Sequence, residues 1–172
     1  MTLRRAPLLL PILLAALVAG CGFHLRREAA LPASMQRVHI AASDPSSQLA
    51  RDLARALPRS GAEVVAAPAP GVAVLAILVD TVSTDVLSVS GTARANEYSL
   101  RHHVEFQLTD PSGTALLPRQ VIELTREFTF DARQALGVAS ETDLLTQELE
   151  REMVQAILRR LEALGDAHAA AG

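Results

Sequence analysis

The chain contains one cysteine, Cys21, and its surroundings suggest a chemical role for the thiol. It follows Ala19 and Gly20, whose small side chains suit a signal peptidase that cannot accept bulky groups beside the scissile bond. A thiol directly after such a cut is the nucleophile to which bacterial lipoprotein maturation attaches diacylglycerol. We therefore predict that Cys21 begins a mature lipoprotein and carries S-diacylglycerol and N-acyl groups. The alternatives are a chance cysteine at an ordinary cleavage site and a buried core cysteine.

The segment before this cysteine has the pattern of a secretory signal. Arg4 and Arg5 form a basic start, and residues 6–20 are uncharged and rich in leucine and alanine. This apolar run is shorter than the ~20 residues that a membrane-spanning helix needs. We predict that residues 1–20 are removed, which leaves 152 residues, enough for one domain with a substantial core. The acyl groups would then anchor that domain to a membrane.

Two arginines are candidates for contact with an anionic group. Arg94 lies at the tip of a predicted hairpin over residues 88–96, and Arg126 lies in the apolar register of its strand, between Leu124 and Phe128. Guanidinium groups bind phosphate and carboxylate groups well, so both side chains could meet a lipid head group. The alternatives are a solvated arginine at the tip and an edge arginine whose stem covers the core.

Other residues that could do chemistry are poorly arranged for it. His102 and His103 are adjacent in a predicted strand, so their side chains point to opposite faces and cannot easily share a metal ion. Asp80 and Asp85 also face opposite sides of a regular strand. The sequence has no serine elbow, no second cysteine and no glycine-rich phosphate loop. We predict no catalytic residue, no metal, no cofactor and no enzymatic activity; an envelope hydrolase would need polar residues that converge in a cleft.

The charge of the predicted mature chain argues against binding to nucleic acid. All 16 basic residues are arginine, and 14 of them remain once Arg4 and Arg5 are lost, against 19 acidic residues, for a net charge of −5. A general nucleic-acid binder would carry a basic excess instead. We therefore expect no nucleic-acid partner.

The first half of the mature chain predicts an extended lead-in and a strand–helix unit. Residues 21–36 contain Leu31-Pro32, which favours an extended backbone. Residues 37–41 alternate in polarity as a short strand, and a helix over residues 45–57 is expected to begin at Asp44 as its N-cap. Residues 63–66 could add a minor strand.

The second half predicts three long strands and a helix. Residues 72–89 begin as a continuous apolar run and continue with period two, and residues 94–109 and 116–130 alternate cleanly on either side of a turn at Asp110. A final helix is expected from Ser140 with an apolar stripe that extends to Leu164.

This element order predicts the fold class. The order β-α-β-β-β-α indicates an α/β two-layer sandwich in which a mixed four-stranded sheet carries two helices on one face. The first βαβ unit makes its strands parallel, and the later strands form an antiparallel meander. We expect one domain over residues 37–164 and a frayed tail over residues 165–172.

Several short segments resemble the LptE family of lipopolysaccharide-assembly lipoproteins. The similarity covers nearly the whole mature chain, and its most specific part is the start directly at the cysteine. The segments are Cys21-Gly22-Phe23-His24-Leu25-Arg26, Leu31-Pro32, Asn96-Glu97-Tyr98 and Phe130-Asp131.

The resemblance implies a lipid-anchored outer-membrane protein whose domain lies on the periplasmic side, as a plug within an LptD-like β-barrel. It implies a part in barrel assembly and in the delivery of lipopolysaccharide to the cell surface, and direct binding of lipopolysaccharide through basic residues. Arg94 falls at the matching hairpin, whereas Val138 and Ala139 stand where the resemblance implies a second basic residue. Gly22, in place of an aspartate that would favour inner-membrane retention, fits outer-membrane sorting. The alternative is a stand-alone periplasm-facing lipid-binding or lipid-transfer lipoprotein.

Overall fold

A computed structural model describes residues 31–89, 95–129 and 135–171 of the chain. It contains one five-stranded sheet, one short and one long α-helix, and two single turns of 3-10 helix. The predicted lipidation site Cys21 and the tip residue Arg94 lie outside the described residues. The strands are β1 (Arg37–Ala42), β2 (Glu63–Val65), β3 (Ala73–Val89), β4 (Ala95–Thr109) and β5 (Ala115–Thr129), and the helices are η1 (Ala33–Met35), α2 (Gln48–Ala56), η2 (Leu57–Ser60) and α3 (Ala135–Ala171).

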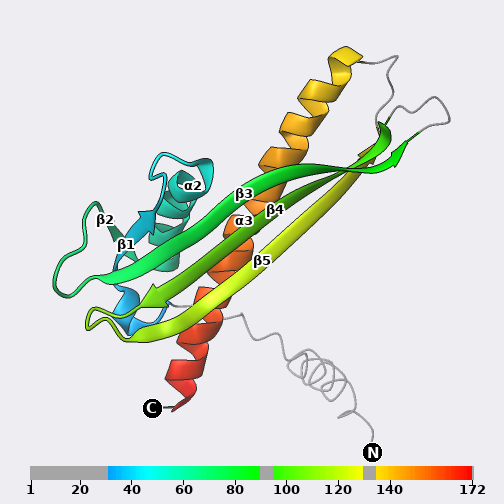
Figure 1. The fold of residues 1–172 in the computed structure, drawn as a ribbon. Helices are drawn as coiled ribbons and strands as arrows, with labels where there is room; N and C mark the ends of the chain where they lie inside the picture. Colours follow the sequence, from blue (N-terminus) through cyan, green and yellow to red (C-terminus); the bar gives the residue numbers. More distant parts are fainter. Residues whose placement is uncertain (1–30, 90–94, 130–134, 172) are drawn as a thin grey trace, which may run out of the picture.

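The sheet has the strand order β2-β1-β3-β4-β5. β1 is parallel to β2 and β3, and β3, β4 and β5 form an antiparallel meander. Both α-helices cover the same face of the sheet (Figure 1). The predicted two-layer α/β sandwich with a mixed sheet is therefore confirmed.

The predicted count of four strands is wrong, because β2 is a fifth. It adds to the outer side of β1 with Arg37 opposite Glu63 and His39 opposite Val65. The imidazole Nδ1 of His39 also donates to the Val65 carbonyl oxygen at 3.1 Å. The minor strand considered over residues 63–66 is therefore present, and its place beside β1 becomes visible only when the backbone groups of β1 are matched.

Helix α2 follows β1 and begins later than predicted. Its N-cap is Ser47, whose hydroxyl accepts a hydrogen bond from the Ala50 N–H at 3.2 Å. Asp44 instead accepts hydrogen bonds from the Ser46 N–H and hydroxyl, so it closes the preceding turn. The predicted apolar stripe is confirmed, because Leu49 and Leu53 are buried.

The long meander has the predicted turn between β4 and β5. The Gly113 N–H donates to the Asp110 carbonyl oxygen at 3.0 Å, and Gly113 has a φ of 87° that favours glycine. The carboxylate of Asp110 accepts hydrogen bonds from the N–H groups of Ser112 and Thr114 at 2.8 Å each. These contacts hold the pKa of Asp110 below its usual range, with the Ser112 hydroxyl as the largest cause.

The core lies between the sheet and the helices. Alternate side chains of β4, including Val104 and Phe106, are fully buried against α3, where Met153 and Ile157 are equally buried. Helix α3 begins at Ala135, before the predicted start at Ser140, and continues to Ala171. Within the described residues, no helix has the combined length and hydropathy required to cross a membrane.

Candidate functional site

The uncovered face of the sheet carries a network of charged side chains, which we call the open face. It comprises Asp85 on β3, Arg101, His103 and Glu105 on β4, and Arg119 and Glu123 on β5. Antiparallel pairing aligns these strands so that alternate residues of each strand share this side. No described helix covers it (Figure 1).

Arg101 links all three strands of the open face. Its Nε lies 3.6 Å from Asp85 Oδ2, and its Nη1 lies 3.3 Å from Glu123 Oε1. The three side chains are 44–54% exposed, so water and salt weaken each pair. The charges nevertheless alternate across the sheet, from an acid on β3 to a base on β4 and an acid on β5.

His103 lies between two carboxylates on the same face. Its Nε2 is 3.1 Å from Glu105 Oε1, and its Nδ1 is 3.5 Å from Glu123 Oε2. The hydrogen bond with Glu105 is the main reason that the pKa of His103 is raised above its ordinary value. The same contact, together with an ion pair to Arg119, holds the pKa of Glu105 below its ordinary value. This arrangement favours the charged forms of His103 and Glu105.

The opposite face of β4 holds a polar pair in which His102 is buried and Asp80 is partly exposed. His102 is 1% exposed, and its Nε2 donates to Asp80 Oδ1 at 2.9 Å. Its other ring nitrogen, Nδ1, is buried and finds no hydrogen-bond partner among the described residues. His102 and His103 thus lie on opposite faces, as predicted, and neither belongs to a metal-binding group of three or more side chains in the described residues.

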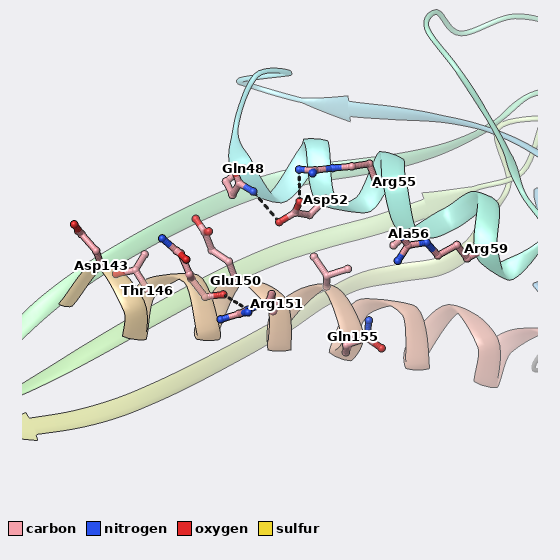
Figure 2. Close-up of a pocket in the computed structure, with 12 residues that line it drawn as sticks. Gln48, Asp52, Arg55, Ala56, Arg59, Asp143, Thr146, Glu150, Arg151 and Gln155 are labelled. Carbon is pink, nitrogen blue, oxygen red and sulfur yellow. Dashed lines mark hydrogen bonds and ion pairs between the residues drawn. The ribbon is translucent and has the colours of Figure 1, made fainter. Parts of the chain in front are cut away.

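A polar groove of about 930 Å³ lies between α2 and α3 (Figure 2). On the α2 side, the Asp52 carboxylate accepts from Gln48 Nε2 at 3.0 Å and lies 2.5 Å from Arg55 Nη2. On the α3 side, burial raises the pKa of the Glu150 carboxyl, while the nearby His102 opposes this change. Arg59, Asp143 and Arg151 complete the charged lining, together with the amide side chains of Gln147 and Gln155.

The predicted lipid contact Arg126 is already engaged within the domain. It pairs with Leu100 across the sheet, which places it on the helix-covered face as its apolar register predicted. One guanidinium nitrogen pairs with Glu152 of α3, and another donates to the Thr125 carbonyl oxygen at 3.0 Å. Because Arg126 and Glu152 are 42% and 40% exposed, an external anion could still compete for the guanidinium.

The comparisons with known proteins decide the family. The family model described as "LptE: Lipopolysaccharide-assembly" matches residues 35–161, which include every strand and both α-helices in whole or in part. The chain belongs to the LptE family.

Curated relatives of this LptE-family chain are named LPS-assembly lipoprotein LptE. The relative from Photorhabdus laumondii is 30% identical over 143 residues, which cover 83% of this chain and 78% of the relative. The relative from Yersinia enterocolitica is 31% identical over 161 residues, which cover 92% of this chain and 77% of the relative. These names describe an assembly role and no reaction, which agrees with the expectation of a protein that is not an enzyme.

Solved structures show the same fold for LptE-like lipoproteins. The solution structure of uncharacterized lipoprotein B from Nitrosomonas europaea is 31% identical in sequence and has a TM-score of 0.72. The match covers 86% of this chain and 96% of that protein's chain. The crystal structure of rare lipoprotein B from Shewanella oneidensis is 28% identical in sequence and has a TM-score of 0.65. The match covers 74% of this chain and 94% of that protein's chain. Both comparisons support the two-layer architecture.

The structure also shows which site residues the sequence reasoning missed in this LptE-family chain. It did not pair His102 with Asp80, because the contact depends on how β3 and β4 are aligned. It did not anticipate the groove, although Gln48, Asp52 and Arg55 recur at spacings of four and three residues, which places them on one side of a helix. That spacing was an available signal.

Proposed function

We propose that the chain is an outer-membrane lipoprotein, anchored through acylated Cys21, that plugs an LptD-like β-barrel and helps it to assemble. In this role it assists the delivery of lipopolysaccharide to the cell surface and binds lipopolysaccharide directly. Its domain lies on the periplasmic side, within the barrel lumen. Membership of the LptE family and the names of the relatives support this proposal.

The observation that carries the proposal is the open face. The interior of a large transmembrane barrel is polar, so a domain inside it needs a surface that stays favourable beside polar groups and water. The open face offers three acidic and three basic or imidazole side chains that already satisfy one another. An apolar face of the same size would instead favour contact with lipid or an apolar partner surface.

The test is the isolation of the full chain from membranes in mild detergent. We expect a stable complex with an outer-membrane β-barrel; a chain that migrates alone would show that the plug proposal is wrong. Charge reversal at Arg101 and Arg119 should reduce the amount of barrel recovered, because two positions of the open face would become repulsive. Arg151→Glu, in the groove on the other side of the sheet, is the matched control and should leave recovery unchanged.

Lipopolysaccharide binding through Arg94 and Arg126 is tested separately. Arg94→Glu and Arg126→Glu should each weaken binding of purified lipopolysaccharide to the full-length protein, and unchanged binding would remove that residue from the site. The ion pair seen here gives a sharper variant. Glu152→Gln should strengthen binding if Arg126 contacts the lipid, because the guanidinium would no longer be held by a carboxylate.

The alternative function, a stand-alone lipid-binding or lipid-transfer lipoprotein, has one observation in its favour. A groove of about 480 Å³ between α3 and β5 includes the apolar residues Leu117 and Ile122, with Arg159 and Arg160 also in its lining. However, Arg160 Nη1 is already hydrogen-bonded to Gln120 Oε1 at 2.5 Å. Recovery of the protein without a barrel, but with bound lipid, would favour this alternative.

A further inference from the structure

The outer edge of β3 loses its neighbouring strand about a third of the way along. β1 pairs with β3 only as far as Ile77, whereas β3 continues to Val89 beside β4 (Figure 1). Over residues 78–89, no described strand pairs with the side of β3 that faces away from β4. Alternate backbone N–H and C=O groups on that side therefore lack strand partners among the described residues, and such an edge can template a further strand.

This exposed edge lacks proline and lysine, two of the devices by which proteins discourage pairing. Residues 78–89 contain no proline, lysine or arginine, and half of them are valine or threonine, which favour strands. Four large apolar side chains are exposed along it: Leu78 (39%), Val82 (40%), Val86 (55%) and Leu87 (51%). Register shifts at Ile77/Val79 and Val86/Ser88 limit the regular stretch to residues 79–86.

The other outer edge of the sheet, formed by β5, is different. β5 contains Pro118, which cannot donate a backbone hydrogen bond, and the charged residues Arg119, Glu123 and Glu127. Proline and charged side chains are the usual protection of edge strands against pairing with other chains. Strand addition is therefore favoured at β3 and disfavoured at β5.

The charges of the β3 edge indicate the kind of strand that it would accept. Asp80 and Asp85 are its only charged residues, and the Asp85 side chain is 54% exposed. A second copy would bring together two edges whose only charged side chains are acidic. Like charges directly opposite each other are destabilising, so a basic partner is favoured over a second copy.

We propose that residues 79–86 of β3 are a strand-addition site for an extended segment of another polypeptide. That segment would carry apolar or β-branched residues at alternate positions, which cover Val82 and Val86, and an arginine or lysine beside Asp85. Backbone hydrogen bonds would supply much of the affinity, and these side-chain contacts the specificity. The inference stands on the edge itself and does not depend on the identity of the barrel partner.

The test uses the full-length protein in mild detergent and a fluorescent peptide of alternating valine and threonine with one central arginine. We expect binding by fluorescence anisotropy and slower amide hydrogen exchange confined to β3. A peptide of the same sequence with N-methyl groups on alternate residues cannot form the strand hydrogen bonds and should not bind. A peptide with glutamate in place of arginine should bind more weakly, and Asp85→Asn should reduce this preference.

A second experiment measures binding of the same peptide to variants of the protein. Val82→Lys with Val86→Lys should weaken binding at least about tenfold, as lysines on an edge strand discourage pairing. Leu144→Lys on α3 is the matched control, because Leu144 is 59% exposed and belongs to a helix and not to the edge strand. The proposal is overturned if the first peptide does not bind, if the N-methylated peptide binds equally well, or if protection from exchange lies outside β3. Concentration-dependent self-association that is lost in the double lysine variant would also overturn it, since a second copy would then be the occupant.

Discussion

The two faces of the long meander differ in what holds their side chains in place. On the helix-covered face of β4, Leu100, His102, Val104, Phe106 and Leu108 are at most 2% exposed. On the open face of the same strand, Arg101 and His103 are 44% and 31% exposed, and they are held by ion pairs. One strand therefore contributes to a packed core on one side and to a hydrated charge network on the other.

This difference indicates which face stabilises the fold and which face can serve as a contact surface. Apolar burial stabilises by about 25 cal/mol per Å², whereas an exposed ion pair contributes about 0–1 kcal/mol. The helix-covered face should therefore tolerate little change, and the open face should tolerate much. The open face can therefore contact a partner without any loss of the core packing that stabilises the fold.

The largest effect is expected from Phe106→Ala on the helix-covered face. Phe106 is fully buried, so its truncation should lower the free energy of unfolding by about 3–5 kcal/mol through lost burial and a cavity. Val121→Ala is the control on the open side, because Val121 lies opposite Glu105 and is 48% exposed. It should change the free energy by no more than about 0.5 kcal/mol. Urea titration followed by circular dichroism measures both, and equal losses would contradict the comparison.

The hydrogen-bonded pair of His102 and Asp80 provides a second test of the helix-covered face. Asp80→Ala would leave both ring nitrogens of His102 without a partner, which should cost about 1–3 kcal/mol in unfolding free energy. Replacing both residues, with His102→Leu added, should cost less than the sum of the single changes. Asp85→Ala, on the exposed side of the same strand, should have a smaller effect. Additive single and double changes would show that the pair is not coupled.

A smaller effect is expected on the open face from Arg101→Ala. The loss of two exposed ion pairs should lower the free energy of unfolding by about 0.2–1 kcal/mol, and 1 M NaCl should reduce that difference. Arg151→Ala is the control, since Arg151 is exposed and has no ion-pair partner among the described residues. A loss at Arg101 as large as that of Phe106→Ala would mean that the open face also supports the fold.

The pH dependence of the open face should be the smallest effect. Because the pKa of His103 is raised, its stabilising contribution is complete below its ordinary value of 6.5 and is lost as the pH rises through the raised value. Because the pKa of Glu105 is lowered, its contribution is present above 4.5 and is lost as the pH falls through the lowered value. Both contributions are therefore present between pH 4.5 and 6.5.

Urea midpoints measured across pH test this assignment. His103→Gln should flatten the fall in stability on the alkaline side, since the titrating group is removed. Asp85→Asn leaves the contacts of His103 intact and should keep the profile of the unmodified protein. If the urea midpoint of His103→Gln still falls as steeply on the alkaline side, another group is responsible for that titration.

Much of the fold could be predicted because its signals are local. Alternation along β4 and β5 predicted the two faces, and the leucine spacing of α2 predicted its buried stripe. The sequence offered β2 only as a possible minor strand, because it has three residues, and the start of α2 depended on whether Asp44 or Ser47 capped it. Short elements and caps are decided by competing local hydrogen bonds, which periodicity does not resolve.

The candidate site was less predictable, because its contacts join distant parts of the chain. Alternation placed Arg126 on the apolar face, but its partner Glu152 lies 26 residues away on a helix. Asp80 meets His102 across 22 residues, and this contact requires the shifted register that follows Ile77. A residue pattern predicts the face of a strand, and strand pairing then decides which side chains meet.

The amino-acid sequence alone determined the strand–helix order, the two-sided character of the meander and the resemblance to the LptE family. It did so because side-chain direction alternates along a strand and repeats every three to four residues along a helix. Only the tertiary structure decided that Arg126 is held by Glu152, that His102 is buried against Asp80, and that β3 extends beyond β1. Those outcomes depend on register and packing between segments, which are set by the free energy of the whole fold and not by any single stretch.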